Sequence, residues 1–130
     1  MESKSALSKV KHFNKCFGVA TNKKPGVLQK KEWALKATLM MEELSEYIHA
    51  CEHNNFIEIA DAIVDMQYIL NGIIVSHGFD NIFNQLFDEV HDSNMSKLEN
   101  GKVLKRKDGK VLKGKNYFKP DLKKILKKWT

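Results

Sequence analysis

Five acidic side chains stand among apolar residues in the middle of the chain. They are Glu43, Glu46, Glu58, Asp61 and Asp65, and they recur at steps of three, four or seven along two stretches with the composition of buried helices. Carboxylate oxygens are the hard ligands that Mg²⁺ and Mn²⁺ prefer, and magnesium usually brings a phosphate with it. Metal-assisted phosphate chemistry is therefore the first chemistry that this pattern indicates.

An antiparallel pair of helices would bring the two acidic stretches to the same height. Glu43 and Glu46 share one helix face, and Glu58, Asp61 and Asp65 share another. If the chain reverses near residue 54, Glu46 comes level with Asp61, and Glu43 comes level with Asp65. Carboxylates gathered without Lys or Arg repel one another, and a cation relieves this repulsion. The alternative is that the acids line the solvent side of two amphipathic helices, but the matched heights favour a metal site.

The net charge of +6 conceals a strong division of charge along the chain. Residues 42–92 contain eleven Asp or Glu and no Lys or Arg, whereas residues 93–130 contain thirteen Lys or Arg and three acids. A basic tail of this kind binds nucleic-acid phosphates, offsets the charge of an acidic site, or keeps a protein soluble. A nucleic-acid- or protein-binding module acting through the tail is therefore the alternative to an enzyme. Loss of activity with EDTA would favour the enzyme.

Amphipathic patterns and turn signals predict four helices, over residues 5–17, 29–53, 56–77 and 80–98, with Asp80 as the N-cap of the last. Residues 99–130 then form a basic extension. In it, Asp108-Gly109 between two short apolar-basic runs indicates a hairpin, and the last residues indicate a short basic helix. We predict a single all-α domain over residues 1–130, an antiparallel helical bundle with a basic C-terminal hairpin or loop annex.

The helix predicted over residues 56–77 is apolar nearly all round. Four helices can hardly cover it on every side, so we expect a homo-oligomer, either a homodimer or a homotetramer. No long uncharged apolar run and no signal-peptide pattern is found, so no membrane span is expected. Cys16 and Cys51 form no CxxC pair, which is typical of free thiols in a reducing compartment. These features predict a cytoplasmic protein.

Two histidines, His49 and His53, are spaced i and i+4 on the second predicted helix. This spacing can hold zinc, but no third ligand is evident and no Glu occupies the position used in metalloproteases. We therefore expect two exposed histidines near a helix end rather than a zinc site. His77, before Gly78, is expected to cap or pack.

The acidic segments resemble those of a known family. "EELSE" (42–46) followed by "EIADAIVD" (58–65) resembles the Glu-x-x-Glu … Glu-x-x-Asp motif of the all-α NTP pyrophosphatases, which include MazG-like and phosphoribosyl-ATP pyrophosphohydrolase-like proteins. "GFDNIFNQLFDEVHDSNMSKL" (78–98) and "DGKVLKGKNYFKPDL" (108–122) resemble a small subgroup labelled phosphoribosyl-ATP pyrophosphohydrolase-like or Cof-like. The resemblance covers most of the chain beyond residue 30. It departs in the short connection between the two acidic segments and in Asp92, where a basic residue is expected.

The resemblance implies a metal-dependent nucleoside triphosphate pyrophosphohydrolase. Such an enzyme converts an NTP or dNTP and water to the monophosphate and pyrophosphate, with Mg²⁺ as cofactor or Mn²⁺ in its place. The implied metal ligands are Glu43, Glu46, Glu58 and Asp61. Glu42 and Asp65 would support the metal or position water, and either Glu42 or Glu43 would accept the water's proton. The preferred base and sugar stay open.

The resemblance also assigns substrate contacts to Asn94 and Lys97, at the end of the fourth predicted helix. Lys97 is the first basic residue after the acidic middle. Its alternative role is to satisfy the last carbonyls of that helix. Tyr117 is a candidate to stack on the base, although pinning the tail to the bundle is the simpler role for Tyr117 and Phe118.

Overall fold

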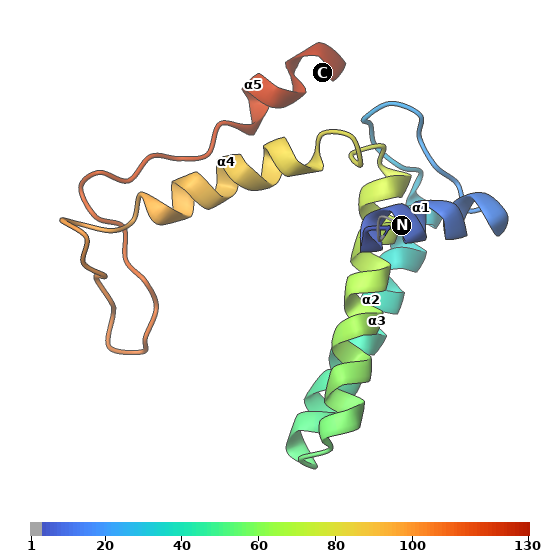
Figure 1. The fold of residues 1–130 in the computed structure, drawn as a ribbon, viewed down its shortest axis with the longest axis horizontal. Coiled ribbons are helices and arrows are strands. Elements are labelled where there is room, and N and C mark those ends of the chain that lie inside the picture. The colour runs from blue at the N-terminus through green and yellow to red at the C-terminus, as the bar shows by residue number, and fades with distance from the viewer. Residues whose placement is uncertain (1–3) are drawn as a thin grey trace. The chain divides into compact units, whose positions relative to one another are not determined.

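The computed structural model describes residues 4–130 and divides the chain into two compact units, Met1–Asp80 and Asn81–Thr130. The first unit contains α1 (Ala6–Cys16), α2 (Lys30–Glu52) and α3 (Phe56–Ser76). The second contains α4 (Phe83–Met95), α5 (Leu122–Leu126) and the 3₁₀ turn η1 (Lys127–Trp129). No strand occurs between residues 4 and 130, so the predicted all-α class is confirmed (Figure 1).

Helices α2 and α3 lie side by side and antiparallel (Figure 1). The chain reverses at Asn54, which has a φ of 50° in the left-handed region that asparagine tolerates. The Asn55 N–H donates to the Ala50 carbonyl at 2.9 Å, which closes the end of α2. The Asn55 side chain then accepts from the Glu58 N–H at 3.2 Å and caps α3. This short reversal occurs at the predicted residue and fixes the register of the acidic side chains.

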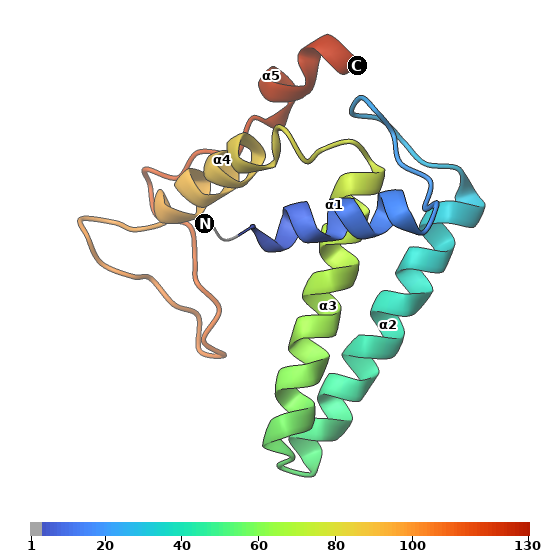
Figure 2. The ribbon, with the colours of Figure 1, turned by 45° about the vertical axis from the view of Figure 1, so that its right-hand side comes forward.

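Helix α1 crosses α3 (Figure 2). The Ser5 hydroxyl caps its first turn by accepting from the Ser8 N–H at 3.1 Å. Val10 is buried against α3 near Gly72, where there is room for close approach. Lys11 forms an ion pair with Asp80 at 2.7 Å. Helix α1 therefore covers one side of the C-terminal half of α3.

A loop between α1 and α2 closes the C-terminal end of α3. The Asn22 N–H donates to the Ser76 carbonyl at 2.9 Å, and His77 Nδ1 lies 2.8 Å from the Gly26 carbonyl oxygen. Gly78 has a φ of +76°, and a Cβ placed on it would lie 2.5 Å from the Lys24 carbonyl oxygen. Only glycine fits this position, and His77 has the capping and packing role predicted for it.

Helix α3 is long enough and apolar enough to cross a membrane, although the sequence analysis predicted no membrane span. Length and composition alone are weak evidence, since the core helix of a soluble protein passes the same test. Asp61 and Asp65 interrupt the apolar surface of α3, and the helix packs against both α1 and α2. Only 28% of the apolar window is buried in the single chain, so much of the apolar surface of α3 stays uncovered.

Helix α4 is shorter than predicted at both ends. It starts at Phe83 with Ile82 as its N-cap and no side-chain cap, because the predicted cap, Asp80, binds Lys11 instead. At its other end the Ser96 hydroxyl donates to the Ser93 carbonyl at 2.6 Å, and the chain turns away from the helix axis.

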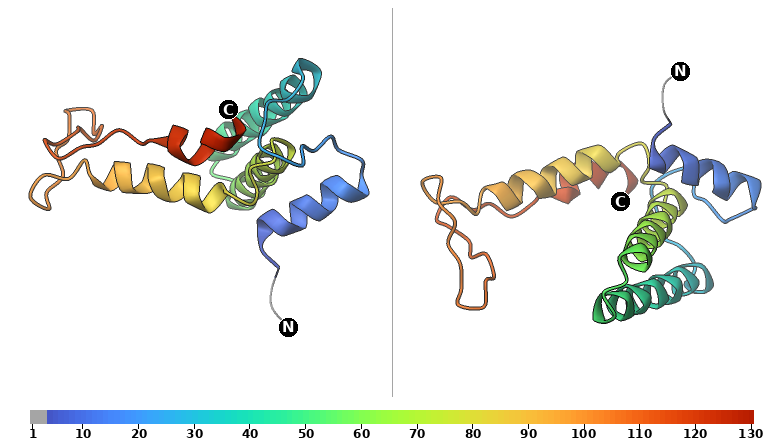
Figure 3. Two further views of the ribbon diagram at one scale, coloured as in Figure 1. Left: turned by 90° about the horizontal axis from the view of Figure 1, so that it is seen from above. Right: turned by 60° about the horizontal axis from the view of Figure 1, so that its bottom comes forward.

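The tail runs back along α4 (Figure 3). The Gly114 N–H donates to the Lys97 carbonyl at 3.0 Å, and the Ser93 hydroxyl donates to the Phe118 carbonyl at 2.8 Å. Further along, Glu89 accepts from the Asp121 N–H at 2.9 Å and pairs with Lys124 at 3.1 Å. Backbone and ionic contacts therefore fasten the tail, while the Phe118 ring stays 46% exposed.

Residues 102–113, which we call the basic arm, form the predicted hairpin. Lys105 and Val111 make a single antiparallel bridge, and Gly109, with a φ of 88°, completes the turn at the tip. A second tight turn at Asn100-Gly101, with φ values of 52° and 73°, precedes the arm. The pairing stays at isolated bridges because the runs that flank each turn are too short for a stable ladder.

Candidate active site

Four carboxylates of the first unit gather between α2 and α3. Glu43 and Glu46 project from α2, and Asp61 and Asp65 project from α3. The negative charges of Glu46, Asp65 and Asp61 all act on Glu43, and those of Asp61 and Glu46 act on Asp65. Four of the five acids therefore act on one another electrostatically, from two helices that pack side by side.

The electrostatics of this group are those of crowded negative charge. Burial raises the pKa of Glu43 above its ordinary value of 4.5, and the charges of Glu46 and Asp65 raise it further. Burial, followed by the charge of Asp61, likewise raises the pKa of Asp65 above 3.8. No basic side chain in residues 4–130 forms an ion pair with the group. The fold therefore bears an electrostatic cost here that a positive partner would remove.

One oxygen of Glu43 marks the point where a partner is needed. Glu43 Oε2 is buried and has no hydrogen-bond partner. Buried polar atoms in folded proteins are nearly always satisfied, and an orphaned one calls for a ligand, an ion or a water molecule. The donor set, made only of carboxylate oxygens, suits a hard divalent cation.

The carboxylates are not arranged in a finished coordination sphere. Nowhere between residues 4 and 130 do three His, Cys, Asp or Glu side chains come close enough together to hold one metal ion. Mutual repulsion keeps such oxygens apart, and a cation would draw them together through rotation about side-chain torsions. The argument for a metal site therefore rests on two features. The available ligands are all carboxylate oxygens, and Glu43 Oε2 is buried without a hydrogen-bond partner.

Glu58 lies beside the group rather than within it. It is exposed in the first turn of α3 and lines a cavity of about 600 Å³. The cavity is walled by Ser45, Glu46, His49, Ala50, His53, Asn55 and Glu58. Glu46 belongs to both the cavity and the carboxylate group, so the two adjoin. Glu42 is exposed on α2 and is not among the groups that act on Glu43 or Asp65.

His49 and His53, for which the sequence predicted no functional role, lie in the wall of this cavity. Both are exposed, as predicted, and their rings lie 4.1 Å apart between centroids. His53 Nδ1 lies 2.9 Å from the His49 carbonyl oxygen, which leaves Nε2 of His53 without a backbone partner. The signal for their position was present, because His49 and His53 follow Glu46 by three and seven residues on one helix face.

The predicted substrate contacts belong to the second unit. Asn94 is exposed, and Lys97 is half-buried just beyond the end of α4. Within the described residues, Lys97 Nζ makes no hydrogen bond to the last carbonyls of α4, so the capping alternative is not observed. The Tyr117 ring lies 4.7 Å from Lys113 Nζ in a cation–π contact.

The first unit is thus an all-α helical hairpin that carries a four-carboxylate site beside an open cavity. The family model for phosphoribosyl-ATP pyrophosphohydrolase matches residues 10–94, a span that includes all of α2 and α3. The chain belongs to the phosphoribosyl-ATP pyrophosphohydrolase family, within the all-α NTP pyrophosphatase (MazG-like) superfamily. Membership implies a pyrophosphohydrolase activity in general. A comparison with curated proteins gives no match.

Proposed function

We propose that the chain is a Mg²⁺-dependent nucleoside triphosphate pyrophosphohydrolase, which converts an NTP or dNTP and water to the monophosphate and pyrophosphate. The observation that carries the proposal is the buried, unpartnered oxygen of Glu43 inside a group of four carboxylates. A triphosphate alone would be repelled by this group, whereas a triphosphate with divalent cations would complement it.

The residues that would hold the cation are Glu43, Glu46, Asp61 and Asp65, and Glu58 is the next nearest across the adjoining cavity. When bound, Mg²⁺ or Mn²⁺ would neutralise phosphate charge and lower the pKa of a bound water. The carboxylates fix where this happens, because α2 and α3 hold them at matched heights.

Glu43 is the better candidate for the proton acceptor of the two that the sequence left open, because it lies within the carboxylate group and one of its oxygens is buried without a partner. Glu42 is exposed to water and lies outside the carboxylate group. Glu43 would take a proton from the water that attacks the α-phosphorus, and the bond from that phosphorus to the bridging oxygen would break.

The cavity beside Glu46 would receive the phosphate chain. His49 and His53 supply ring nitrogens in its wall, and imidazole N–H groups donate hydrogen bonds to phosphate oxygens. We further propose that Asn94, Lys97 and Tyr117 of the second unit contact the nucleotide, as the resemblance implies. Lys97 supports this role because its Nζ has no ion pair among residues 4–130.

Self-association is part of the proposal. On α3, Ile57 is 76% exposed and Val64 is 62% exposed, and α2 also leaves several large apolar side chains in solvent. A soluble protein rarely leaves so much of a core helix uncovered, so a second copy, in a homodimer or homotetramer, would cover it. We place this enzyme in the cytoplasm.

The first experiment is a hydrolysis screen of purified protein against NTPs, dNTPs and phosphoribosyl-ATP, with Mg²⁺, Mn²⁺ or EDTA. Products would be separated by chromatography. Monophosphate and pyrophosphate from NTPs or dNTPs, lost with EDTA, would support the proposal. Turnover of phosphoribosyl-ATP alone would keep the reaction but replace the substrate. Diphosphate and phosphate as products would place the attack at a different phosphorus and contradict it.

A further inference from the structure

The second unit carries the net positive charge of the protein. Residues 81–130 contain thirteen Lys or Arg and six Asp or Glu, a net charge of +7. Residues 1–80 contain nine basic and ten acidic residues, a net charge of −1. The match to the pyrophosphohydrolase family ends at residue 94, before the basic arm begins. The arm therefore needs an explanation of its own.

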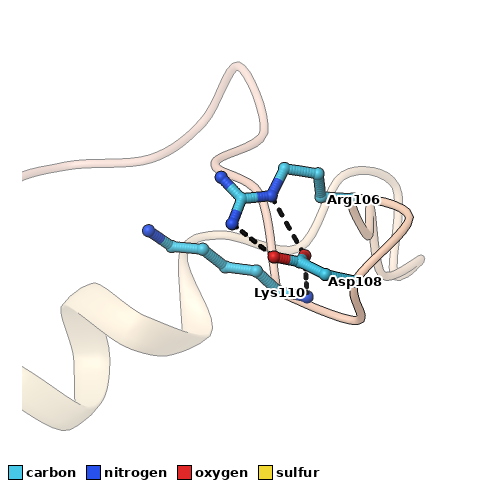
Figure 4. A network of polar contacts seen from close by, with 3 residues as sticks. All are labelled: Arg106, Asp108 and Lys110. Atoms are coloured by element: carbon cyan, nitrogen blue, oxygen red, sulfur yellow. Dashed lines mark hydrogen bonds and ion pairs between the residues drawn. The ribbon is translucent and has the colours of Figure 1, made fainter.

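The acidic residues near the arm are already engaged. Glu99 lies 4.0 Å from Lys115, and Asp121 accepts from the Lys124 N–H as the N-cap of α5. Asp108, the only acid within the arm, accepts hydrogen bonds from the Arg106 side chain and the Lys110 N–H (Figure 4). In the described structure, five arm lysines have no ion-pair partner: Lys102, Lys105, Lys107, Lys110 and Lys113.

The register of the hairpin distributes these cations over both faces of the arm. Lys105 pairs with Val111, and the Leu112 N–H donates to the Leu104 carbonyl at 2.7 Å, so residues whose numbers sum to 216 lie opposite each other. Because side chains alternate between faces, Lys105 and Lys113 share one face. Lys110 lies on the other face with Leu104 and Leu112, and Lys102 stands at the base of the arm, where its backbone pairs with Glu99. Val or Leu side chains stand between the cations on each face.

The arm is held in shape before any partner arrives. The Arg106 N–H donates to the Lys110 carbonyl at 2.8 Å, and the Gly109 N–H donates to the Arg106 carbonyl at 2.9 Å. At its base, the Glu99 and Lys102 backbones exchange two hydrogen bonds of 2.9 Å. Gly114 packs so closely on the end of α4 that an added Cβ would lie 2.9 Å from the Lys97 carbonyl. These contacts fix the tip and the base of the arm, and a single bridge joins the two runs between them.

We propose that the basic arm binds duplex DNA, entering the major groove and contacting phosphates on both sides without reading the sequence. The major groove admits a two-stranded ribbon, and a ribbon with cations on both faces meets a row of phosphates on each wall. Arg106, the arginine of the arm, donates to Asp108, so its guanidinium is not available for bidentate hydrogen bonds to a guanine. A lipid surface suits the arm less well, because its apolar side chains are not gathered on one face.

The test is fluorescence anisotropy with a labelled DNA duplex at several salt concentrations. The arm variant is K105A/K107A/K110A, and the matched control is K23A/K30A/K31A, which removes the same charge from exposed positions of the first unit. Each lost phosphate contact lowers the magnitude of the salt slope by about 0.9, so the arm variant should lose about 2 to 3 and bind roughly tenfold or more weakly. The control should bind nearly as wild type, and K105R/K107R/K110R should retain binding.

Several results would overturn the proposal. The first is no binding to the duplex at low salt. The second is an equal loss of affinity for the duplex in the arm variant and in the control. The third is binding to single-stranded DNA, RNA or anionic vesicles that is at least as tight as binding to duplex DNA. Circular dichroism should be unchanged in all variants. Nucleotide hydrolysis by the arm variant should also be unchanged, because none of its three lysines has a role in the carboxylate site. Failure of hydrolysis in the wild type would bear on the proposed enzyme and not on DNA binding.

Discussion

Glu46 on α2 and Asp61 on α3 both belong to the carboxylate group, and their substitution tests the site directly. Glu46→Gln and Asp61→Asn keep size and hydrogen bonding but remove charge, so each should lower kcat by more than about 100-fold. The melting temperature of the metal-free protein should stay the same or rise, since repulsion is relieved. Glu52→Gln, an exposed acid at the end of α2, is the matched control. Near-normal turnover of either site variant would remove that residue from the site.

Glu43 predicts a dependence of stability on pH. Its pKa is raised in the folded protein, so the folded state binds more protons than the unfolded state as pH rises above about 4.5. The contribution of Glu43 to stability is therefore highest below that pH and falls through the window between the unfolded and folded pKa values. Glu43→Gln should melt higher than wild type at pH 7 and like wild type near pH 4, both measured with EDTA. A difference that did not change with pH would contradict this interpretation.

The second unit should respond to pH in the opposite direction. The Asp121 N–H and Lys124 lower the pKa of Glu89, so its contribution is present above the ordinary value of 4.5 and is lost as pH falls. This is why the Glu43 test compares a variant with wild type at each pH, rather than following wild type alone.

Helical spacing was sufficient to predict the carboxylate group because side-chain direction in a helix follows from residue number. It could not predict which oxygen is buried without a partner, since the exposure of Glu43 depends on the packing of α2 against α3. It also left His49 and His53 out, because the cavity that they line is set by the loop at Asn55.

Gly78 carries the strongest steric constraint among the connecting segments. Gly78→Ala would place an alanine in the left-handed backbone conformation and its Cβ 2.5 Å from the Lys24 carbonyl oxygen. The strain and the clash together should lower the free energy of unfolding by more than about 2 kcal/mol. Gly18→Ala is a matched control, because Gly18 has a similar φ of +66° but no atom within 4 Å of the added Cβ. It should cost only about 1 kcal/mol. Urea unfolding of both variants measures the difference, and equal losses would show that the loop moves aside.

The order and type of the main helices could be predicted, whereas some of their ends could not. Turn residues such as Asn54 act locally, and the reversal between α2 and α3 was placed correctly. Asp80 was predicted to cap α4, but Lys11, distant in sequence, binds it instead. Ser96 likewise ends α4 early because it serves the returning tail at Phe118. Long-range partners of this kind leave no periodic signal.

At the scale of the whole molecule, the uncovered apolar surface of α3 predicts self-association. Light scattering after size exclusion should give a multiple of the 15.0 kDa chain mass. Ile57→Glu with Val64→Glu should shift the protein toward the monomer without loss of helicity, because both side chains are exposed in the single chain. Lys23→Glu, a charge change in an exposed loop, should leave the mass unaltered. A wild-type monomer at all concentrations would contradict the prediction.

The separation of charge between the two units has a practical consequence for handling the protein. The isoelectric point near 9.3 predicts retention on a cation exchanger at neutral pH. Since the first unit has a net charge of −1, the resin would hold the chain by the second unit, in a preferred orientation. Elution order would then rank variants by the charge of the second unit. A sample nicked by trypsin among the arm lysines would separate, once denatured, into a basic fragment that binds and an acidic one that flows through.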